Sequence, residues 1–163
     1  MSSANLAGLP VYRTKIQADW IDYNGHLRDA YYGLILSYAT DDMMDHLGLD
    51  AAYRQRTHCT LYTLEVHIHF LHEVKGSDEL EVRTSILESD RKRIHVRCVF
   101  TCARLHEPVA AAEAMLLHVR QGEKPASAPF PADIEERLEL LKSAAAEPSP
   151  AVPRSRQIAI KRS

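Results

Sequence analysis

The stretch that decides the fold is residues 22–48, DYNGHLRDAYYGLILSYATDDMMDHLG. Its first five residues place a carboxylate, an amide, a glycine and an imidazole in a turn directly before helix-forming sequence. Apolar residues then recur at steps of three and four, which predicts one long helix over 30–47. We expect Asp29 to cap its start and Gly48 to end it. The positions on the apolar stripe are Tyr31, Leu34, Ile35, Tyr38, Ala39, Met43 and Leu47.

After this helix the apolar pattern changes to a period of two. Alternation predicts a short edge strand before the turn and four strands after the helix, at 11–18, 60–72, 79–87, 93–103 and 109–119. Residues 50–59 between them are expected to form a loop with at most a short helical turn. Short connections between successive strands favour antiparallel hairpins. The helix can bury its stripe only on such a sheet, so we predict an α+β fold, an antiparallel sheet wrapped around one long helix.

The chain beyond the sheet is predicted to hold a Pro/Ala/Ser-rich linker, a short amphipathic helix, a Pro-rich stretch and a basic tail, at 125–131, 132–145, 147–153 and 154–163. The apolar side of that helix carries Ile134, Leu138 and Leu141. The tail either docks as an extended segment or stays mobile. We expect a single domain over 1–163, with a core at about 10–122 and the C-terminal helix and tail at about 131–163.

Composition narrows the classes of partner. A net charge of −2 gives no global field that would attract nucleic acid or an anionic membrane. No apolar run reaches the roughly 20 residues that a membrane span needs, and no signal peptide is recognised, so we expect a cytoplasmic protein. Cys98 and Cys102 lie too far apart on one strand to form a disulfide, and with Cys59 they are expected to be buried, reduced thiols.

The turn offers the best candidates for chemistry. Asp22, Asn24 and His26 could form an acid–base or nucleophilic group. Backbone N–H groups at the start of the helix, around Asp29 and Ala30, could stabilise an oxyanion. The alternative is an ordinary Asx turn with a left-handed glycine and a solvated histidine.

Two other groups of residues could bind a ligand, but each also has a purely structural explanation. His67 and His69 leave one face of a strand and could chelate a metal with His72, but surface or subunit-interface histidines are the more common case, and no metal is expected. Arg91 and Lys92, in the basic run 91–93, could hold the phosphates of a nucleotide ligand or simply form a solvated turn.

The order of elements and the motif together resemble the hotdog-fold acyl-CoA thioesterases of the 4-hydroxybenzoyl-CoA thioesterase type, over about residues 10–122. The resemblance implies that Asp22 acts as nucleophile or as general base for water, and that the amides around Asp29 and Ala30 polarise the thioester carbonyl. The segment TLEVHIHFLHEVKGSDELEVRTSIL, residues 63–87, is similar to the second and third strands of that family.

The phrase DYNGH at 22–26 also resembles the Asp-x-Asn-x-His of hotdog acyl-carrier-protein thioesterases, whose Asn and His take part in catalysis. The chain departs from that pattern where Arg28 and Asp29 replace a pair of asparagines, which leaves the role of His26 open. A related hydratase motif has its histidine five residues after the aspartate; here the interval is four, which counts against a hydratase.

The longer stretch WIDYNGHLRDAYY, residues 20–32, resembles the corresponding segment of a narrower group of bacterial thioesterases. These enzymes release betaine from betainyl-CoA in carnitine breakdown. We therefore expect hydrolysis of an acyl-CoA with a short polar or cationic acyl group. Coenzyme A would enter as part of the substrate, with no separate cofactor. The expected substrate-binding residues are Trp20, Tyr23, Tyr32, Tyr62, Arg91 and Lys92. The alternatives are a non-catalytic acyl-CoA-binding protein and an enoyl-CoA hydratase.

The exposed edge of such a sheet favours pairing of two copies. We therefore expect a homodimer or a dimer of dimers, with the site between subunits.

Overall fold

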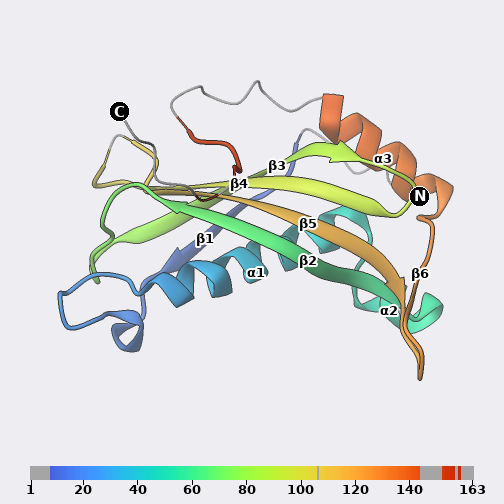
Figure 1. Ribbon diagram of the computed structural model, residues 1–163, viewed down its shortest axis with the longest axis horizontal. Helices are drawn as coiled ribbons and strands as arrows, with labels where there is room; N and C mark the ends of the chain where they lie inside the picture. Colours follow the sequence, from blue (N-terminus) through green and yellow to red (C-terminus); the bar gives the residue numbers. More distant parts are fainter. Residues whose placement is uncertain (1–7, 106, 144–151, 157, 159–163) are drawn as a thin grey trace.

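The computed structural model describes residues 8–105, 107–143, 152–156 and 158. One antiparallel sheet curls around one long helix, as the sequence predicts (Figure 1). Its strand order is β1-β3-β4-β5-β2, with the short β6 beside β5. The elements in chain order are β1 (Val11–Lys15), η1 (Ala18–Trp20), α1 (Asp29–Leu47), α2 (Ala51–Thr57), β2 (Cys59–Phe70), β3 (Glu79–Ser89), β4 (Arg93–Cys102), β5 (Ala110–Arg120), β6 (Ala126–Ser127) and α3 (Ala132–Ser143).

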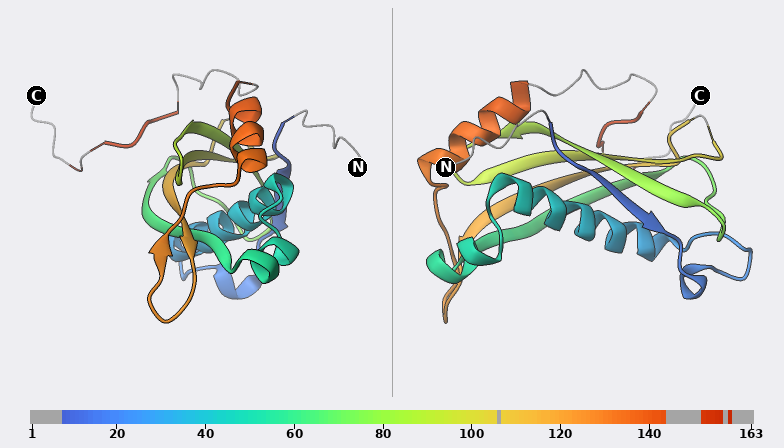
Figure 2. Two further views of the ribbon diagram at one scale, coloured as in Figure 1. Left: turned by 90° about the vertical axis from the view of Figure 1, so that its right-hand side faces the viewer. Right: turned by 180° about the vertical axis from the view of Figure 1, so that it is seen from behind.

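Helix α1 packs on the concave face of the sheet (Figure 2). Its buried residues are Tyr32, Ile35, Leu36, Ala39, Met43, Met44 and Leu47. The predicted stripe is therefore wrong at Tyr38, which is 43% exposed. Tyr31 and Leu34 are partly buried, and Tyr31 packs against the core. Tyr31 stacks on Trp20 with ring centroids 5.2 Å apart, and Tyr38 lies 6.3 Å from Tyr12. The rings of Tyr31 and Tyr38 thus pack at the margin of the sheet, beside η1 and β1. The centre of the sheet covers the adjacent face of α1, which carries the buried residues.

The ends of α1 follow local sequence, with one correction. The helix begins at Asp29 and its N-cap position is Arg28, one residue before the predicted cap. The Asp29 carboxylate instead accepts a hydrogen bond from the Ala30 amide at 2.8 Å. At the other end Gly48 takes the left-handed conformation, φ 85°, as predicted. The last helical carbonyl, of Leu47, accepts from Arg137 Nη1 of α3.

Three short elements, η1, α2 and β6, go beyond what the sequence predicts. Helix α2 occupies what the sequence favours as a loop, because Asp50 caps it by accepting from the Tyr53 amide at 2.8 Å and Tyr53 is buried in the core. Strand β6 forms within the predicted linker, where it pairs with the end of β5 at Val119 and Arg120. Short-range side-chain and strand contacts outweigh the weak local preferences here. The first strand is also shorter than predicted, since the chain leaves the sheet after Lys15 and turns into η1.

The predicted apolar side of the C-terminal helix is confirmed, because Ile134, Leu138 and Leu141 are buried. Helix α3 packs against β3. Strand β1 pairs with β3 only from Glu79 to Arg83, so the rest of β3 has no strand on that side among the described residues. The last two residues predicted for this helix, 144–145, lie outside the described residues, as do 147–151 of the Pro-rich stretch and 159–163 of the basic tail.

Part of the tail docks on the sheet face opposite α1 (Figure 1). There Arg97 Nη2 donates to the Val152 carbonyl at 2.7 Å. The Arg154 guanidinium pairs with Glu113 at 2.7 Å. For residues 152–156 the extended, docked alternative is therefore the correct one.

The three cysteines are buried free thiols, as predicted. Burial raises the pKa of the Cys98 thiol to about 11. In the part of the chain that the structure describes, no helix is both long and apolar enough to span a membrane.

Candidate active site

Residues 22–26 form a tight turn around the Asp22 carboxylate. Asp22 Oδ1 accepts hydrogen bonds from the Asn24 amide at 2.8 Å and from the His26 amide at 3.0 Å. The Gly25 amide donates to the Asp22 carbonyl, and its φ of 81° is one that glycine adopts without strain. The backbone is thus the Asx turn of the plainer alternative, and the same bonds fix the carboxylate in place.

These bonds also set the charge of Asp22. The hydrogen bond from the His26 amide, helped by that from Asn24, holds the pKa of the Asp22 carboxyl below its usual range. The carboxylate is therefore ionised at neutral pH. Among the described residues, Asp22 Oδ2 has no hydrogen-bond partner. One oxygen is positioned by the turn and the other is available to a substrate or a water molecule.

The turn is anchored to the connection between β2 and β3. The Leu27 amide donates to the Val74 carbonyl at 2.8 Å, and His26 forms a bridge with Lys75. Leu27 and Val74 are both buried. The connection itself is braced by the ion pair of Asp78 with Arg104 at 2.8 Å. Two segments far apart in sequence therefore hold the turn against the start of α1, at one end of the sheet.

The imidazole of His26 points to a residue that the sequence analysis did not select. Its Nε2 lies 3.1 Å from Glu73 Oε2. Glu73 belongs to the β2–β3 connection, whose sequence predicts only a turn. No pattern in the sequence indicates the pair, because it depends on the register of β2 against β5 and on the anchoring of the turn.

A cavity of about 280 Å³ opens beside this pair, between the start of α1 and the end of β2. Its lining residues are His26, Leu27, Asp29, Tyr32, Phe70, Leu71, His72, Glu73 and Val74. Asp22 lies in the turn that ends at His26 and does not itself line the cavity. Of the two predicted oxyanion donors, the Ala30 amide is bonded to the Asp29 carboxylate and would have to exchange partners to bind an oxyanion.

The predicted aromatic residues do not form one cluster. Tyr32 lines the cavity and is buried, which raises the pKa of its hydroxyl to about 12. Trp20 stacks on Tyr31, and Tyr23 is 93% exposed at the tip of the turn. Tyr62 lies near the start of β2, opposite Leu117, at the other end of the sheet. The ring that does accompany Tyr32 is Phe70, with centroids 5.1 Å apart and planes at 77°, a residue that the sequence analysis did not select.

Arg91 and Lys92 also lie away from Asp22 within one protomer. They occupy the β3–β4 hairpin, while Asp22 follows β1, whose last residue Lys15 pairs with the opposite end of β3 at Glu79. A second cavity, of about 520 Å³, is lined by Asp90, Arg91, Lys92, Ser127 and Pro129. Lys92 Nζ donates to Ser127 Oγ at 3.3 Å.

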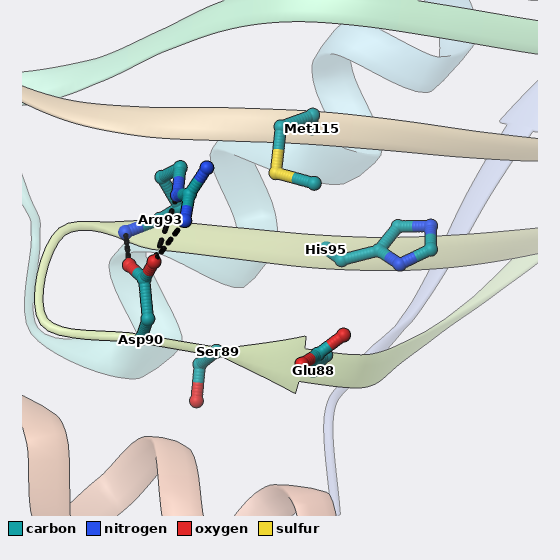
Figure 3. A pocket seen from close by; sticks show the side chains of 6 residues that line it. All are labelled: Glu88, Ser89, Asp90, Arg93, His95 and Met115. Carbon is teal, nitrogen blue, oxygen red and sulfur yellow. Dashed lines mark hydrogen bonds and ion pairs between the residues drawn. The ribbon is translucent and has the colours of Figure 1, made fainter.

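A third cavity, of about 220 Å³, is lined by residues of β3, β4 and β5 beside the same hairpin (Figure 3). Asp90 accepts from the Arg93 Nε at 2.8 Å, and this bond is the main reason why the pKa of Asp90 falls to about 2. His95 points along β4, away from that pair, and bonds to Glu113 at 2.9 Å (Figure 3). The charged groups drawn in Figure 3 are thus largely paired already, and none of them is a predicted site residue.

The histidines of β2 lie with their rings close together, His67 and His69 having centroids 4.7 Å apart. His72 instead pairs with Glu107 at 2.9 Å. Within the described residues, no three His, Cys, Asp or Glu side chains converge on a point where a metal could bind.

Comparison with known proteins places this geometry in a family. A model described as the thioesterase-like superfamily matches residues 16–138, which include the turn, α1, strands β2 to β6 and the first part of α3. The chain belongs to the thioesterase-like superfamily. It is an enzyme of the thioester hydrolase class, and the antiparallel sheet around one helix is the hotdog fold.

Several relatives within the superfamily cover most of the chain. A betainyl-CoA thioesterase of Pseudomonas aeruginosa is 46% identical over 136 residues, 83% of this chain and 85% of that protein. A candidate thioesterase from Pseudomonas putida KT2440 with a crystal structure is 46% identical, with a TM-score of 0.75 over 93% of this chain and all of that one. A Staphylococcus aureus protein solved in complex with CoA is 25% identical, with a TM-score of 0.84 over 98% of this chain and all of that one.

One further relative is a larger protein. An L-carnitine dehydrogenase/betainyl-CoA thioesterase of Agrobacterium fabrum is 40% identical over 119 residues. The match covers 68% of this chain and only 22% of that protein.

Proposed function

We propose that this enzyme hydrolyses betainyl-CoA to betaine and coenzyme A. The observation that carries the proposal is the 46% identity to the Pseudomonas aeruginosa betainyl-CoA thioesterase over 83% of the chain. The Agrobacterium fabrum relative joins a matching segment to an L-carnitine dehydrogenase, which supports a role in carnitine breakdown. Coenzyme A enters as part of the substrate, and the proposed reaction needs no separate cofactor. The three free thiols support a cytoplasmic location.

Asp22 is the proposed catalytic carboxylate. Its free oxygen, Oδ2, attacks the thioester carbonyl and the C–S bond breaks, which gives a mixed anhydride and the CoA thiolate. Water then hydrolyses the anhydride and restores the carboxylate. In the alternative route Asp22 takes a proton from a water molecule, which adds to the carbonyl directly. The C–S bond then breaks, and the proton held by Asp22 passes to the departing CoA thiolate. The lowered pKa of Asp22 keeps the carboxylate ionised, which both routes require.

His26 and the helix start have supporting roles in this proposal. The His26 imidazole is held by Glu73 and can orient the water molecule that hydrolyses the anhydride. Amides in the first turn of α1, around Asp29 and Ala30, stabilise the oxyanion once the Asp29 carboxylate releases the Ala30 amide. Asn24, exposed in the turn, contributes the backbone amide that holds Asp22. Its side chain is proposed to help orient the carboxylate or the water molecule.

The proposed active form is a homodimer built through the edge strand β2. Large apolar side chains on this edge are exposed: Tyr62 by 38%, Leu64 by 56% and Val66 by 42%. An unpaired apolar edge of this kind is stabilised by pairing with a second copy. Two such dimers could associate further, which would give the predicted dimer of dimers.

The dimer would also bring the predicted substrate-binding residues of one protomer close to the predicted catalytic residues of the other. Strand β2 runs from Cys59, opposite Arg120 at the hairpin end of the sheet, to Phe70, which lines the cavity beside His26. Antiparallel pairing of β2 with its copy sets the Phe70 end of one strand against the Cys59 end of the other. The partner's Arg91, Lys92 and Tyr62 then lie at the end that holds Asp22, where they can bind the CoA phosphates and close the site.

The test is a panel of thioesters followed by thiol release with the full chain. We expect betainyl-CoA to be hydrolysed with a higher kcat/KM than palmitoyl-CoA, because the cavity is small and lined by carboxylates. A kcat/KM for palmitoyl-CoA that equals or exceeds that for betainyl-CoA would overturn the substrate proposal.

A further inference from the structure

The cavity at the start of α1 combines two carboxylates with two aromatic rings. Asp29 and Glu73 line it from the helix and from the β2–β3 connection. Tyr32 and Phe70 meet edge to face at 5.1 Å on its wall. Phe70 is 54% exposed, so part of its ring is free to contact a ligand.

The charges around Glu73 leave the cavity negative. Glu73 Oε2 contacts His26 Nε2 at 3.1 Å. The Arg104 guanidinium donates to the Glu73 carbonyl but is paired with the Asp78 carboxylate through both Nε and Nη2. The other histidine of the lining, His72, pairs with Glu107. Within the part of the chain that the structure describes, the lining holds the two carboxylates of Asp29 and Glu73 and no Lys or Arg side chain.

We propose that Glu73 and Phe70 form the subsite for the quaternary ammonium group of the acyl moiety, and that Glu73 makes the enzyme prefer a cationic acyl group over a neutral one of the same shape. This inference rests on the proposed function. A trimethylammonium group has no N–H to donate, so it is recognised by aromatic faces and by the field of a nearby carboxylate. Glu73 supplies the field and Phe70, with Tyr32 behind it, supplies the face.

The same assignment changes which aromatic residues recognise the substrate. Trp20 is occupied by its stack on Tyr31, and Tyr23 projects from the tip of the turn at 93% exposure. Neither lines the cavity. The cation-binding face is thus assigned to the end of β2 and the segment that follows it, and the turn is left to catalysis.

The experiment compares betainyl-CoA with its uncharged isostere, 3,3-dimethylbutyryl-CoA, in the wild type and in Glu73→Gln. Glutamine keeps the size of the side chain and can still bond to His26, so the variant removes only the charge. We expect the ratio of kcat/KM for the two substrates to fall by about fivefold, as for a partly solvated charge contact, through a raised KM for betainyl-CoA. In Phe70→Leu the ratio should fall by about threefold, from the lost cation–π contact.

Glu107→Gln is the matched control. Glu107 has a side chain as exposed as that of Glu73, 73% in both, and it too pairs with a histidine, but it does not line the cavity. Its ratio should equal that of the wild type. An unchanged ratio in Glu73→Gln, or an equal fall in Glu107→Gln, overturns the inference and leaves betainyl-CoA hydrolysis standing. A wild type that does not hydrolyse betainyl-CoA overturns the proposed function itself, and the inference with it.

Discussion

Asp22 and His26 are joined by two hydrogen bonds that run in opposite directions, one to a backbone carbonyl and one to the Asp22 carboxylate. The Asp22 amide donates to the His26 carbonyl at 2.8 Å, and the His26 amide donates to Asp22 Oδ1 at 3.0 Å. The imidazole of His26 takes no part in either bond and reaches Glu73 instead. The position of the carboxylate therefore depends on the backbone of residue 26 and not on its side chain.

His26→Ala should consequently leave Asp22 in place. We expect kcat/KM for betainyl-CoA to fall by about tenfold, because only the orientation of the water molecule is lost while the amide that holds Asp22 remains. Thiol release measures the rate, and circular dichroism checks that the fold is kept. A loss as large as that caused by removing Asp22, or no loss at all, would contradict the supporting role given to the imidazole.

Gly33 lies inside α1 and Gly48 follows its last residue, and replacing each by alanine should change the free energy of unfolding in opposite directions. Gly48→Ala should lower the free energy of unfolding by about 1–2 kcal/mol, because φ is 85° and a Cβ there would meet the Arg137 guanidinium. Gly33→Ala, in the helix interior with nothing within 4 Å of its Cβ, should raise it by about 0.5–1 kcal/mol. Urea unfolding of both variants tests the pair. A Gly48→Ala protein at least as stable as the wild type would show that the backbone of residue 48 does not need glycine.

The hairpin that carries Arg91 and Lys92 should depend on the charge of Asp90. Its pKa is lowered from an ordinary 3.8 to about 2, mainly by the bond from Arg93, so the stabilisation is present above the unfolded value and is lost as the pH falls through the folded one. Since Asp90 is largely exposed, Asp90→Asn should lower Tm at pH 7 by only about 2 °C. The difference from the wild type should shrink between pH 4 and pH 2.

Glu139→Gln is the control for the loss of one exposed carboxylate, because it breaks the pair with Lys142 on α3 and leaves Asp90 unchanged. A Tm difference for Asp90→Asn that is constant from pH 7 to pH 2 would remove the ion pair as its cause.

Features of the fold that depend on contacts between residues close in sequence could be predicted, and features that depend on contacts between distant segments could not. Local patterns predicted α1 and its glycine end, the four long strands and the turn at Asp22, because periodicity and turn chemistry act within a few residues. The helix face was wrong by about one residue, since the position of the sheet margin at Tyr12 and Trp20 decides which side of α1 is buried.

The cavity could not be predicted, because its residues come from separate segments. Glu73 and Phe70 carry no local pattern that points to a ligand, and they meet His26 only through strand register and the anchoring of Leu27 to Val74. Arg91, Lys92 and Tyr62 were grouped with the turn by residue type. The structure places them at the other end of the protomer, so their grouping with Asp22 depends on the proposed dimer.

The edge of β2 therefore carries its own prediction. Val66→Lys places a charge on the exposed edge and should convert a dimer into a monomer, with loss of most of the activity because the partner's Arg91 and Lys92 are removed from the site. Light scattering coupled to size-exclusion chromatography measures the mass. Leu140→Lys, at a 50% exposed leucine on α3, should remain dimeric and active. A wild type that is monomeric at micromolar concentration would contradict the proposed assembly.

The central claim is that Asp22 carries the chemistry of thioester hydrolysis, and the most direct measurement is kcat for betainyl-CoA in Asp22→Ala. Alanine removes the carboxylate and nothing in the core, so the account predicts a fall of about 100-fold or more with an unchanged circular dichroism spectrum. Asp42→Ala, at an exposed carboxylate on the outer side of α1, should keep the wild-type rate. Near wild-type turnover by a folded Asp22→Ala protein would contradict the account.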